Sequence, residues 1–242
     1  MKPKYSVIIA TKNEEESIAK VICSFPDAVK KQSEIIVVDS STDHTPIIAE
    51  SLGVKVIRER GKGKGRAMKT GVKASRGDII IFMDGDGTDP PSFIPQILKK
   101  LEHNDMVLGS RSMREFPEDD PTMRRIFKFY GPLSVRPVFR MAGFKVNGDP
   151  LAGFRAIRKK DWYRLGLKSN DFRIEAEMNM QAVKLGFRLG EIPIPHLKRG
   201  GGLMKSKLVT SPKMWIKIMN IPLKEIKNEK IKNRLKEKID SL

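Results

Sequence analysis

The first 110 residues alternate between two hydrophobic periods, and this alternation restricts the fold more than any other feature of the sequence. Short runs rich in β-branched residues predict strands that are buried on both faces. These runs cover residues 5–10, 34–39, 54–59, 78–84 and 105–110. Segments with helical spacing separate the runs, at residues 16–25, 45–52, 65–75 and 92–102. Strands that alternate with helices predict βαβ units, and therefore an α/β fold with a doubly wound, mostly parallel sheet flanked by helices.

Polar loops follow four of these predicted strands. They cover residues 11–14, 39–43, 61–65 and 84–89. In open α/β sheets, ligands bind beyond the carboxyl ends of the strands. We therefore expect the four loops to form one binding site.

The stretch IIIFMDGDGTDPP, at 79–91, concentrates acids at the end of a buried strand. Asp84 and Asp86 are close together, and neighbouring carboxylates are tolerated when a cation lies between them. Magnesium takes carboxylate oxygens and shares its other positions with ligand phosphates, so the pair predicts a metal site. A solvated turn is the alternative for both residues. Asp89 is expected to cap the helix that begins near Pro91.

Two other loops carry side chains suited to a nucleotide. The glycines of GKGKGRA, at 61–67, together with the helix that follows, predict a site for an anionic group, with a flexible basic loop as the alternative. Thr11 and Asn13 open the site edge after the first strand. Asp39 ends the second strand, where its carboxylate can accept hydrogen bonds from a base or ribose. No G-x-G-x-x-G follows the first strand, which disfavours a dinucleotide cofactor.

The second half of the chain is more basic. Residues 113–147 interleave Arg and Lys with Phe and Tyr, which predicts one or two basic amphipathic helices. Further on, the sequence predicts a strand at 150–159, a helix at 172–186 and a strand at 187–195. A glycine-rich basic loop and a tail that begins MWIKIMNIPL end the chain.

Composition limits the class of protein. A chain of 242 residues with 39% hydrophobic residues is long enough for one large domain, and no apolar run approaches the roughly 20 residues that span a bilayer. One cysteine and three scattered histidines argue against a disulfide, a thiolate cluster or zinc, so a cytoplasmic location is expected. Residues 198–242 hold 13 Lys or Arg against 4 Asp or Glu, which is nine of the 18 excess positive charges. This basic block suits nucleic acid, anionic lipid or solubility alone.

The ordered motifs resemble a known family. VIIATKNEEESI, EIIVVDSSTDHT, GKGKGRAMKTGVKASRGDIIIFMDGDGTDPP and VLGSR follow the pattern of family-2 glycosyltransferases of the GT-A fold. GDPLAGFRAIRKKDW and KRGGGLMKSKL are similar to the dolichyl-phosphate mannose and glucose synthases within that family. The resemblance covers residues 4–210 and implies a GT-A domain over 1–210. Its nucleotide-sugar-binding half would be 1–110 and its acceptor half 111–210, followed by a basic amphipathic tail at 211–242.

The resemblance also implies roles for individual residues. The nucleotide-sugar site would consist of Ala10, Thr11, Asn13, Glu14, Asp39, Lys64 and Asp84. Asp86 would ligate Mg²⁺ or Mn²⁺ together with Asp84, and Thr88 stands where relatives often have a glutamine ligand. The acceptor phosphate would be bound by Arg111, Arg125, Arg199, Ser206 and Lys207, with Arg124 as the alternative to Arg125.

The implied reaction is direct displacement at the anomeric carbon of a nucleotide sugar, with UDP-glucose favoured over GDP-mannose and polyprenyl phosphate as acceptor. Asp84, Asp86 and Arg111 would be catalytic. A phosphate acceptor is already ionised at pH 7, whereas an alcohol would need a carboxylate base. Glu177, with Glu175 beside it, is the candidate for that base. Asp149 is expected to bind sugar hydroxyls or to shape a turn.

Alternative functions remain open at this point. The enzyme alternatives are a transferase using a small acceptor such as 3-phosphoglycerate, and one that extends a lipid-linked glycan. A nucleic-acid-binding module would explain the charge, but 7% aromatic residues offer few stacking surfaces. A lipid acceptor predicts a peripheral protein at the cytoplasmic face of a membrane, with apolar side chains of residues 214–223 inserted and a membrane protein or a second copy as partner.

Overall fold

The computed structural model describes residues 2–61, 63–111, 135–195, 197, 199–200, 211–227, 233 and 236–237. Among these residues, seven strands form one sheet. The strands are β1 (Tyr5–Thr11), β2 (Ser33–Asp39), β3 (Lys55–Arg58), β4 (Ile79–Asp84), β5 (Met106–Arg111), β6 (Arg155–Arg158) and β7 (Leu189–Ile194). The helices are α1 (Ile18–Cys23), α2 (Asp27–Lys30), α3 (Thr45–Ser51), α4 (Lys64–Ala74), η1 (Pro91–Phe93), α5 (Ile94–Leu101), α7 (Val135–Met141), α8 (Lys159–Arg164), α9 (Ile174–Lys184) and α10 (Pro212–Glu225).

The strand order is β3-β2-β1-β4-β6-β5-β7, and every neighbouring pair is parallel except the two that involve β6. The predicted α/β fold with a mostly parallel sheet is therefore confirmed. The five strands expected in the first 110 residues are all present. The strand expected at 150–159 is β6, but the sequence did not indicate that it runs antiparallel. Because it does, the beginning of β6 lies beside the carboxyl ends of β4 and β5.

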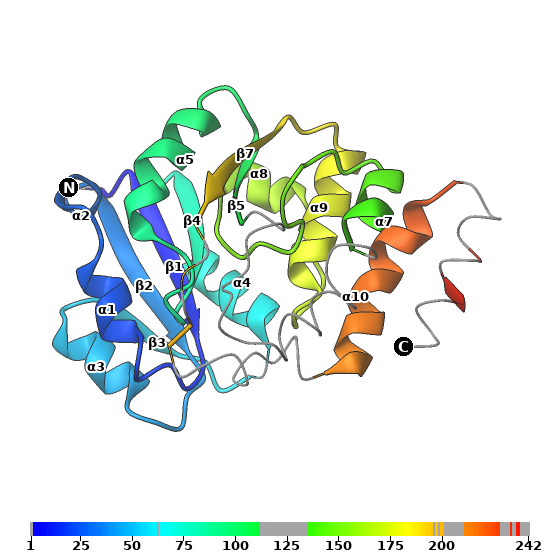
Figure 1. Ribbon diagram of the computed structural model, residues 1–242. Helices are drawn as coiled ribbons and strands as arrows, with labels where there is room; N and C mark the ends of the chain where they lie inside the picture. Colours follow the sequence, from blue (N-terminus) through cyan, green and yellow to red (C-terminus); the bar gives the residue numbers. More distant parts are fainter. Residues whose placement is uncertain are drawn as a thin grey trace.

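Helices cover both faces of the sheet (Figure 1). Successive residues of β1 point to opposite faces, so Val7 and Ile9 belong to one buried cluster and Ile8 to the other. Helices α1, α2, α3 and α5 contribute to the first cluster, and α4, α7, α8, α9 and α10 contribute to the second. This double covering explains why the strand sequences are apolar throughout rather than alternating.

Helix α10 packs against α9 and α7 (Figure 1). Ile218 and Met219 are 0% exposed and Leu223 is 3% exposed, all within the second cluster. The prediction that the apolar side chains of residues 214–223 insert into a membrane surface is therefore wrong for these three residues. No helix in the described part of the chain is both long enough and apolar enough to span a bilayer.

Two short helices, α2 and α8, were not expected from the sequence. They have four and six residues, too few to show a hydrophobic period. The basic helical region expected at 113–147 is represented by α7, which buries Val135, Val138 and Phe139 and carries Arg140 in its last turn. The remainder of that prediction, up to residue 134, lies outside the described residues.

Candidate active site

The carboxyl ends of β1, β2 and β4 meet at one edge of the sheet, as the sequence predicts. Parallel pairing places Thr11 beside Asp39 and Ala10 beside Asp84. Because β2 and β4 flank β1, the two aspartates end the strands on either side of it. Four of the predicted site residues therefore lie together.

Asp39 is held by a set of donors from three segments. Its carboxylate accepts hydrogen bonds from Thr11 Oγ1 at 2.9 Å, from the Ser41 backbone N–H at 3.0 Å and from Arg58 Nη1 at 2.9 Å. The side chain is 1% exposed. The contacts bring the predicted residues Thr11 and Asp39 together and fix the orientation of the carboxylate at the edge.

Asn13 and Glu14 join the loop after β1 to the loop after β2. Asn13 has a φ of 58°, a conformation that asparagine tolerates better than most residues. Its backbone N–H donates to Ser41 Oγ at 2.7 Å, and its side-chain oxygen accepts from the Thr42 N–H at 2.9 Å. The Glu14 N–H donates to Thr45 Oγ1 at 2.9 Å. These hydrogen bonds therefore join the two loops at the edge of the site.

Lys64 lies between two carboxylates. Its Nζ is 2.6 Å from Asp84 Oδ1 and 2.7 Å from Glu175 Oε1. Burial alone would lower the pKa of Lys64, but the two carboxylates outweigh burial and raise the pKa above its ordinary value. Burial would likewise raise the pKa of Asp84, and the Lys64 ammonium instead lowers it. The three groups are thus a charged cluster, which joins α4, β4 and α9.

Asp89 does not cap a helix, contrary to the prediction. Pro90 and Phe93 precede η1 and α5, and no described side chain caps either helix. Asp89 Oδ2 instead accepts from the Asp84 backbone N–H at 3.0 Å, and within the described residues its Oδ1 has no hydrogen-bond partner. Burial and the nearby Asp84 charge raise the pKa of Asp89 to about 7. Its charge therefore changes near neutral pH.

Asp86 is 2% exposed and already has partners on both oxygens. Oδ1 accepts from the Thr88 N–H at 2.9 Å and from Thr88 Oγ1 at 2.7 Å. Oδ2 pairs with the guanidinium of Arg199, and the Gly200 N–H donates to the Asp86 carbonyl at 2.9 Å. Asp86 Oδ2 therefore lies beside a bound positive charge.

Arg111, at the end of β5, lies among the acids. Burial would lower the pKa of Arg111, but nearby carboxylates raise it, and these are Asp89, Asp149, Asp84 and Asp86. Asp149 Oδ1 accepts from the Leu151 N–H at 2.8 Å, so Asp149 does shape a turn. Arg111 thus brings a cation from β5 to the carboxylates that follow β4.

The glycine-rich loop before α4 is used differently from the prediction. The Gly65 N–H donates to the Asp171 carbonyl at 3.3 Å, and the Arg66 N–H to the Asn170 carbonyl at 2.9 Å. Gly63 has a φ of +121°, and a Cβ there would lie 2.2 Å from the Asn170 carbonyl oxygen. Two backbone amides that were expected to bind an anion therefore already donate to carbonyls of the protein. The residue of this segment that reaches the site is Lys64, through its side chain.

Glu177 is not the acid that α9 brings to the cluster. Its oxygens accept from the backbone N–H groups of Lys168 and Ser169, at 2.8 and 2.7 Å. Glu175, two residues earlier, is 3% exposed and contacts Lys64. Of the two acids named from the sequence, it is therefore Glu175, and not Glu177, that lies in the cluster. Arg124, Arg125, Ser206 and Lys207 lie outside the described residues.

Arg155 is a buried residue of this region that was not among the site residues predicted from the sequence. It is 0% exposed and lies at the beginning of β6, beside the carboxyl ends of β4 and β5. The available signal was Arg155 between apolar neighbours in the strand sequence FRAIR, which holds a second arginine only at its end, Arg158.

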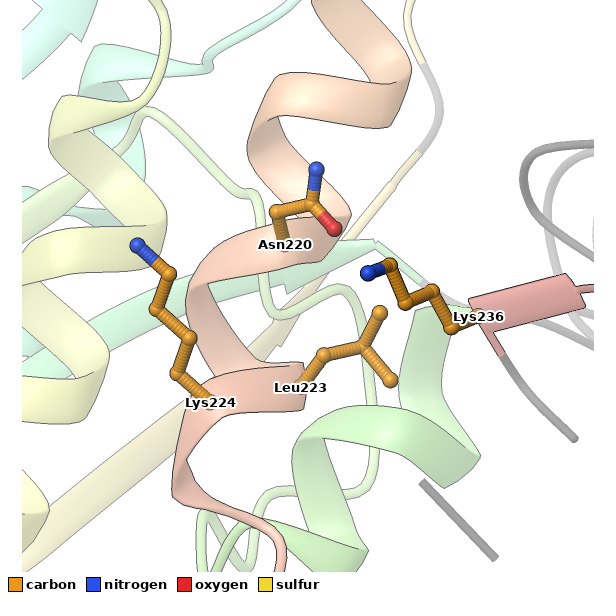
Figure 2. A pocket seen from close by; sticks show the side chains of 4 residues that line it. All are labelled: Asn220, Leu223, Lys224 and Lys236. Atoms are coloured by element: carbon orange, nitrogen blue, oxygen red, sulfur yellow. The ribbon is translucent and has the colours of Figure 1, made fainter. Parts of the chain in front are cut away.

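A separate pocket of about 270 Å³ adjoins α10 (Figure 2). Its lining residues are Asn220, Leu223, Lys224 and Lys236. None of them belongs to the carboxylate cluster. Within the described residues, no three acidic, histidine or cysteine side chains form a complete metal site.

Comparisons with known proteins identify the family of the chain. The model of the family described as Glycosyl transferase family 2 matches residues 6–165. The chain is 28% identical to a dolichyl-phosphate hexose transferase of Haloferax volcanii over 197 residues, covering 81% of this chain and 84% of the relative. It is 31% identical to an undecaprenyl-phosphate mannosyltransferase of Micrococcus luteus over 211 residues, covering 82% and 85%. Some other relatives are longer, and the chain spans 64% and 52% of two further Haloferax volcanii glycosyltransferases.

A solved structure confirms the fold. Glucosyl-3-phosphoglycerate synthase from Mycobacterium tuberculosis, in complex with Mn²⁺ and UDP-glucose, matches with a TM-score of 0.72 at 23% identity. The match covers 93% of this chain and 79% of that one. At this identity the likeness concerns the fold alone.

Proposed function

Because the chain belongs to glycosyl transferase family 2, we propose that it is an inverting hexosyltransferase that moves a hexose from a nucleotide diphosphate sugar to a polyprenyl phosphate. The observation that carries the proposal is the cluster of Asp84, Asp86, Lys64 and Arg111 at the carboxyl edge of the sheet. The names of two relatives, a dolichyl-phosphate hexose transferase and an undecaprenyl-phosphate mannosyltransferase, support the lipid acceptor.

The acids at the end of β4 fit a divalent metal. Asp86 Oδ2 already accepts a cationic partner in Arg199, so its surroundings suit positive charge. Mg²⁺ and Mn²⁺ prefer oxygen ligands of this kind. Asp86 would hold the ion, together with Asp84 and the hydroxyl of Thr88. When bound, the ion would supply charge neutralisation for the departing nucleoside diphosphate.

Other side chains would bind the nucleoside and orient the sugar of the donor. Ala10, Thr11, Asn13, Glu14 and Asp39 would line the nucleoside site. Lys64 keeps Asp84 ionised, and Asp84 would then orient the sugar by accepting hydrogen bonds from its hydroxyls.

Basic side chains would bind the acceptor. An oxygen of the acceptor phosphate would attack the anomeric carbon as the bond to the diphosphate breaks. Arg111 and Arg199 would hold that phosphate in line with the bond, and Arg125, Ser206 and Lys207 are proposed to join them. The phosphate oxygen is already ionised, so no base is needed.

Two alternatives use a different acceptor. The first is a small phosphorylated acceptor such as 3-phosphoglycerate, which the name of the structural neighbour glucosyl-3-phosphoglycerate synthase brings into consideration although the likeness concerns the fold alone. A glycan hydroxyl would require a carboxylate base, and Glu175 is better placed for that role than Glu177, whose oxygens are bonded to backbone amides. The hypothesis of a basic nucleic-acid-binding module gives no function to the acidic cluster.

The donor and the location are part of the same proposal. UDP-glucose is favoured as donor, with GDP-mannose as the second candidate. A polyprenyl acceptor places the protein at the cytoplasmic face of a membrane, either alone, as a homodimer or with a membrane-protein partner. Residues 198–242, with nine excess positive charges from 13 basic and 4 acidic residues, would attract an anionic leaflet.

A donor-by-acceptor assay tests the proposal. UDP-glucose and GDP-mannose are each incubated with Mn²⁺ and either polyprenyl phosphate or 3-phosphoglycerate, and the product mass is read. We expect hexosyl-phosphoryl-polyprenol from the wild type and none from Asp86→Ala. Asp78→Ala, at the opposite end of β4 with a side chain 78% exposed, is the matched control and should retain activity. Product from 3-phosphoglycerate alone would establish the small-acceptor alternative instead.

A further inference from the structure

Arg155 is a charged side chain that lies entirely within the protein. It is 0% exposed, and within the described residues its hydrogen-bond acceptors are carbonyl and amide oxygens and the Met178 sulfur, not a carboxylate. Burial lowers the pKa of its guanidinium, although an arginine stays charged in proteins. Burying a charge is costly unless hydrogen bonds replace its water shell. The hydrogen bonds of Arg155 therefore indicate what this residue organises.

These bonds converge on one short loop. Arg155 Nε donates to the Ala152 carbonyl at 2.9 Å, and Nη2 donates to the same oxygen and to the Pro150 carbonyl. Nη1 donates to Asn179 Oδ1 at 3.0 Å, and Asn179 Nδ2 donates to the Pro150 carbonyl at 2.5 Å. We call this pair of side chains the Arg155–Asn179 clamp. The clamp donates hydrogen bonds to two carbonyls of the loop 150–153, those of Pro150 and Ala152.

The other side of the same loop faces the charged cluster. A Cβ added at Gly153 would lie 2.8 Å from Asp84 Oδ2 and 2.8 Å from Lys64 Nζ, so the main chain rests directly against this ion pair. Asn179 is also one helical turn after Glu175, whose Oε1 lies 2.7 Å from Lys64 Nζ. The clamp therefore supports both the loop and the helix that contact Lys64.

We propose that Arg155 and Asn179 are positioning residues for the donor sugar. The clamp holds the loop 150–153 against Asp84 and Lys64, and so fixes the shape of the site where the sugar binds. Both side chains are 0% exposed, so they act through the loop and not by touching the substrate. The inference rests on the proposed function, because it takes a nucleotide sugar as the ligand of this edge.

The test compares donor binding in Arg155→Lys and Asn179→Ala with that of the wild type. Lysine keeps the charge but cannot reproduce the planar fork of the guanidinium. Without the clamp, donor binding itself would have to order the loop 150–153, so the free energy of the lost hydrogen bond would be taken from the binding free energy. For one hydrogen bond to a charged group, this corresponds to a weakening of about tenfold or more in the Kd for the donor. The Kd is measured by calorimetry with UDP-glucose and GDP-mannose in the presence of Mn²⁺. We also expect the donor KM to rise by the same factor while the acceptor KM stays unchanged.

Arg158→Met is the matched control. Arg158 lies on the same strand and also donates to main-chain carbonyls, those of Asn104 at 2.9 Å and Leu101 at 2.8 Å. It pairs with Ile79 at the start of β4, so it occupies the opposite edge of the sheet. Its replacement should lower the melting temperature but leave the donor Kd within about twofold of the wild type, as expected for distant sites.

The outcomes separate a positioning role from a merely structural one. Lower melting temperatures with an unchanged donor Kd in both clamp variants would overturn the proposal. If Arg155→Lys does not fold, the smaller change Asn179→Ala decides alone. A wild type that binds neither nucleotide sugar refutes the proposed function and this inference with it. A wild type that binds a donor while the clamp variants bind it equally well refutes this inference alone.

Discussion

Asp89 provides the most direct test of the electrostatics at this edge. Its pKa is raised to about 7 from an ordinary value of 3.8, first by burial and then by the charge of Asp84. In the unfolded chain the carboxyl returns to its ordinary pKa. Between these two values the folded protein binds the proton more tightly than the unfolded chain does. The contribution of Asp89 to the free energy of unfolding therefore falls as the pH rises from about 4 to 7.

The magnitude follows from the two pKa values. One pKa unit corresponds to about 1.4 kcal/mol, so ionised Asp89 destabilises the fold by on the order of 4 kcal/mol well above pH 7. Asp89→Asn keeps an oxygen that can accept from the Asp84 N–H, and it removes the charge. The substitution should therefore stabilise the protein at pH 8. Its advantage should shrink by about 2–3 kcal/mol at pH 5, where the folded carboxyl is neutral.

Urea unfolding followed by circular dichroism, in EDTA and at pH 5, 6, 7 and 8, measures this difference. Asp78→Asn, an exposed aspartate at the other end of β4, is the control and should show little pH dependence. A difference between Asp89→Asn and wild type that is equal at all four pH values would refute the reasoning, whatever its sign. A difference in unfolding free energy that does not change with pH would reflect only the replacement of Oδ1 by the asparagine amide group.

Three further variants test other contacts of the site. Lys64→Met leaves two largely buried carboxylates without their cation and should lower the free energy of unfolding by about 3–5 kcal/mol at pH 7, measured by urea unfolding. Arg199→Ala removes the cation that pairs with Asp86 and should tighten Mn²⁺ binding about threefold or more without nucleotide, measured by electron paramagnetic resonance. Gly153→Ala places a Cβ 2.8 Å from Lys64 Nζ and should weaken donor binding about tenfold or more, measured by calorimetry, without loss of Mn²⁺ binding.

The location of the site could be predicted because it depends on strand ends alone. Parallel strands that are buried on both faces can be recognised from their composition, and their carboxyl ends share an edge. Asp39 and Asp84 end β2 and β4, and the pairing of both strands with β1 places them as expected. This inference needed no knowledge of any long-range contact.

The acid supplied by α9 could not be predicted in the same way. A helix with one polar face shows which of its residues point outward, but α9 is buried nearly all round. Glu175 and Asn179 are buried in the same helix as Ile174 and Met178. With no polar stripe to orient the helix, the sequence could not show that Glu175, rather than Glu177, faces Lys64.

The positive charges of the site could not be assigned to the acids from the sequence. Asp84, Asp86 and Asp89 are neighbours along the chain, so the negative charge is visible in a single loop. The cations that balance them come from separate parts of the chain. Lys64 begins α4, Arg111 ends β5, Arg155 begins β6 and Arg199 follows β7. None of these bases is near the acids in sequence, and only the completed sheet brings them to one edge. The balance of charge at this edge is therefore a property of the tertiary fold. The pKa of Asp89 shows it, because burial and the Asp84 charge raise this pKa while the Arg111 guanidinium opposes them.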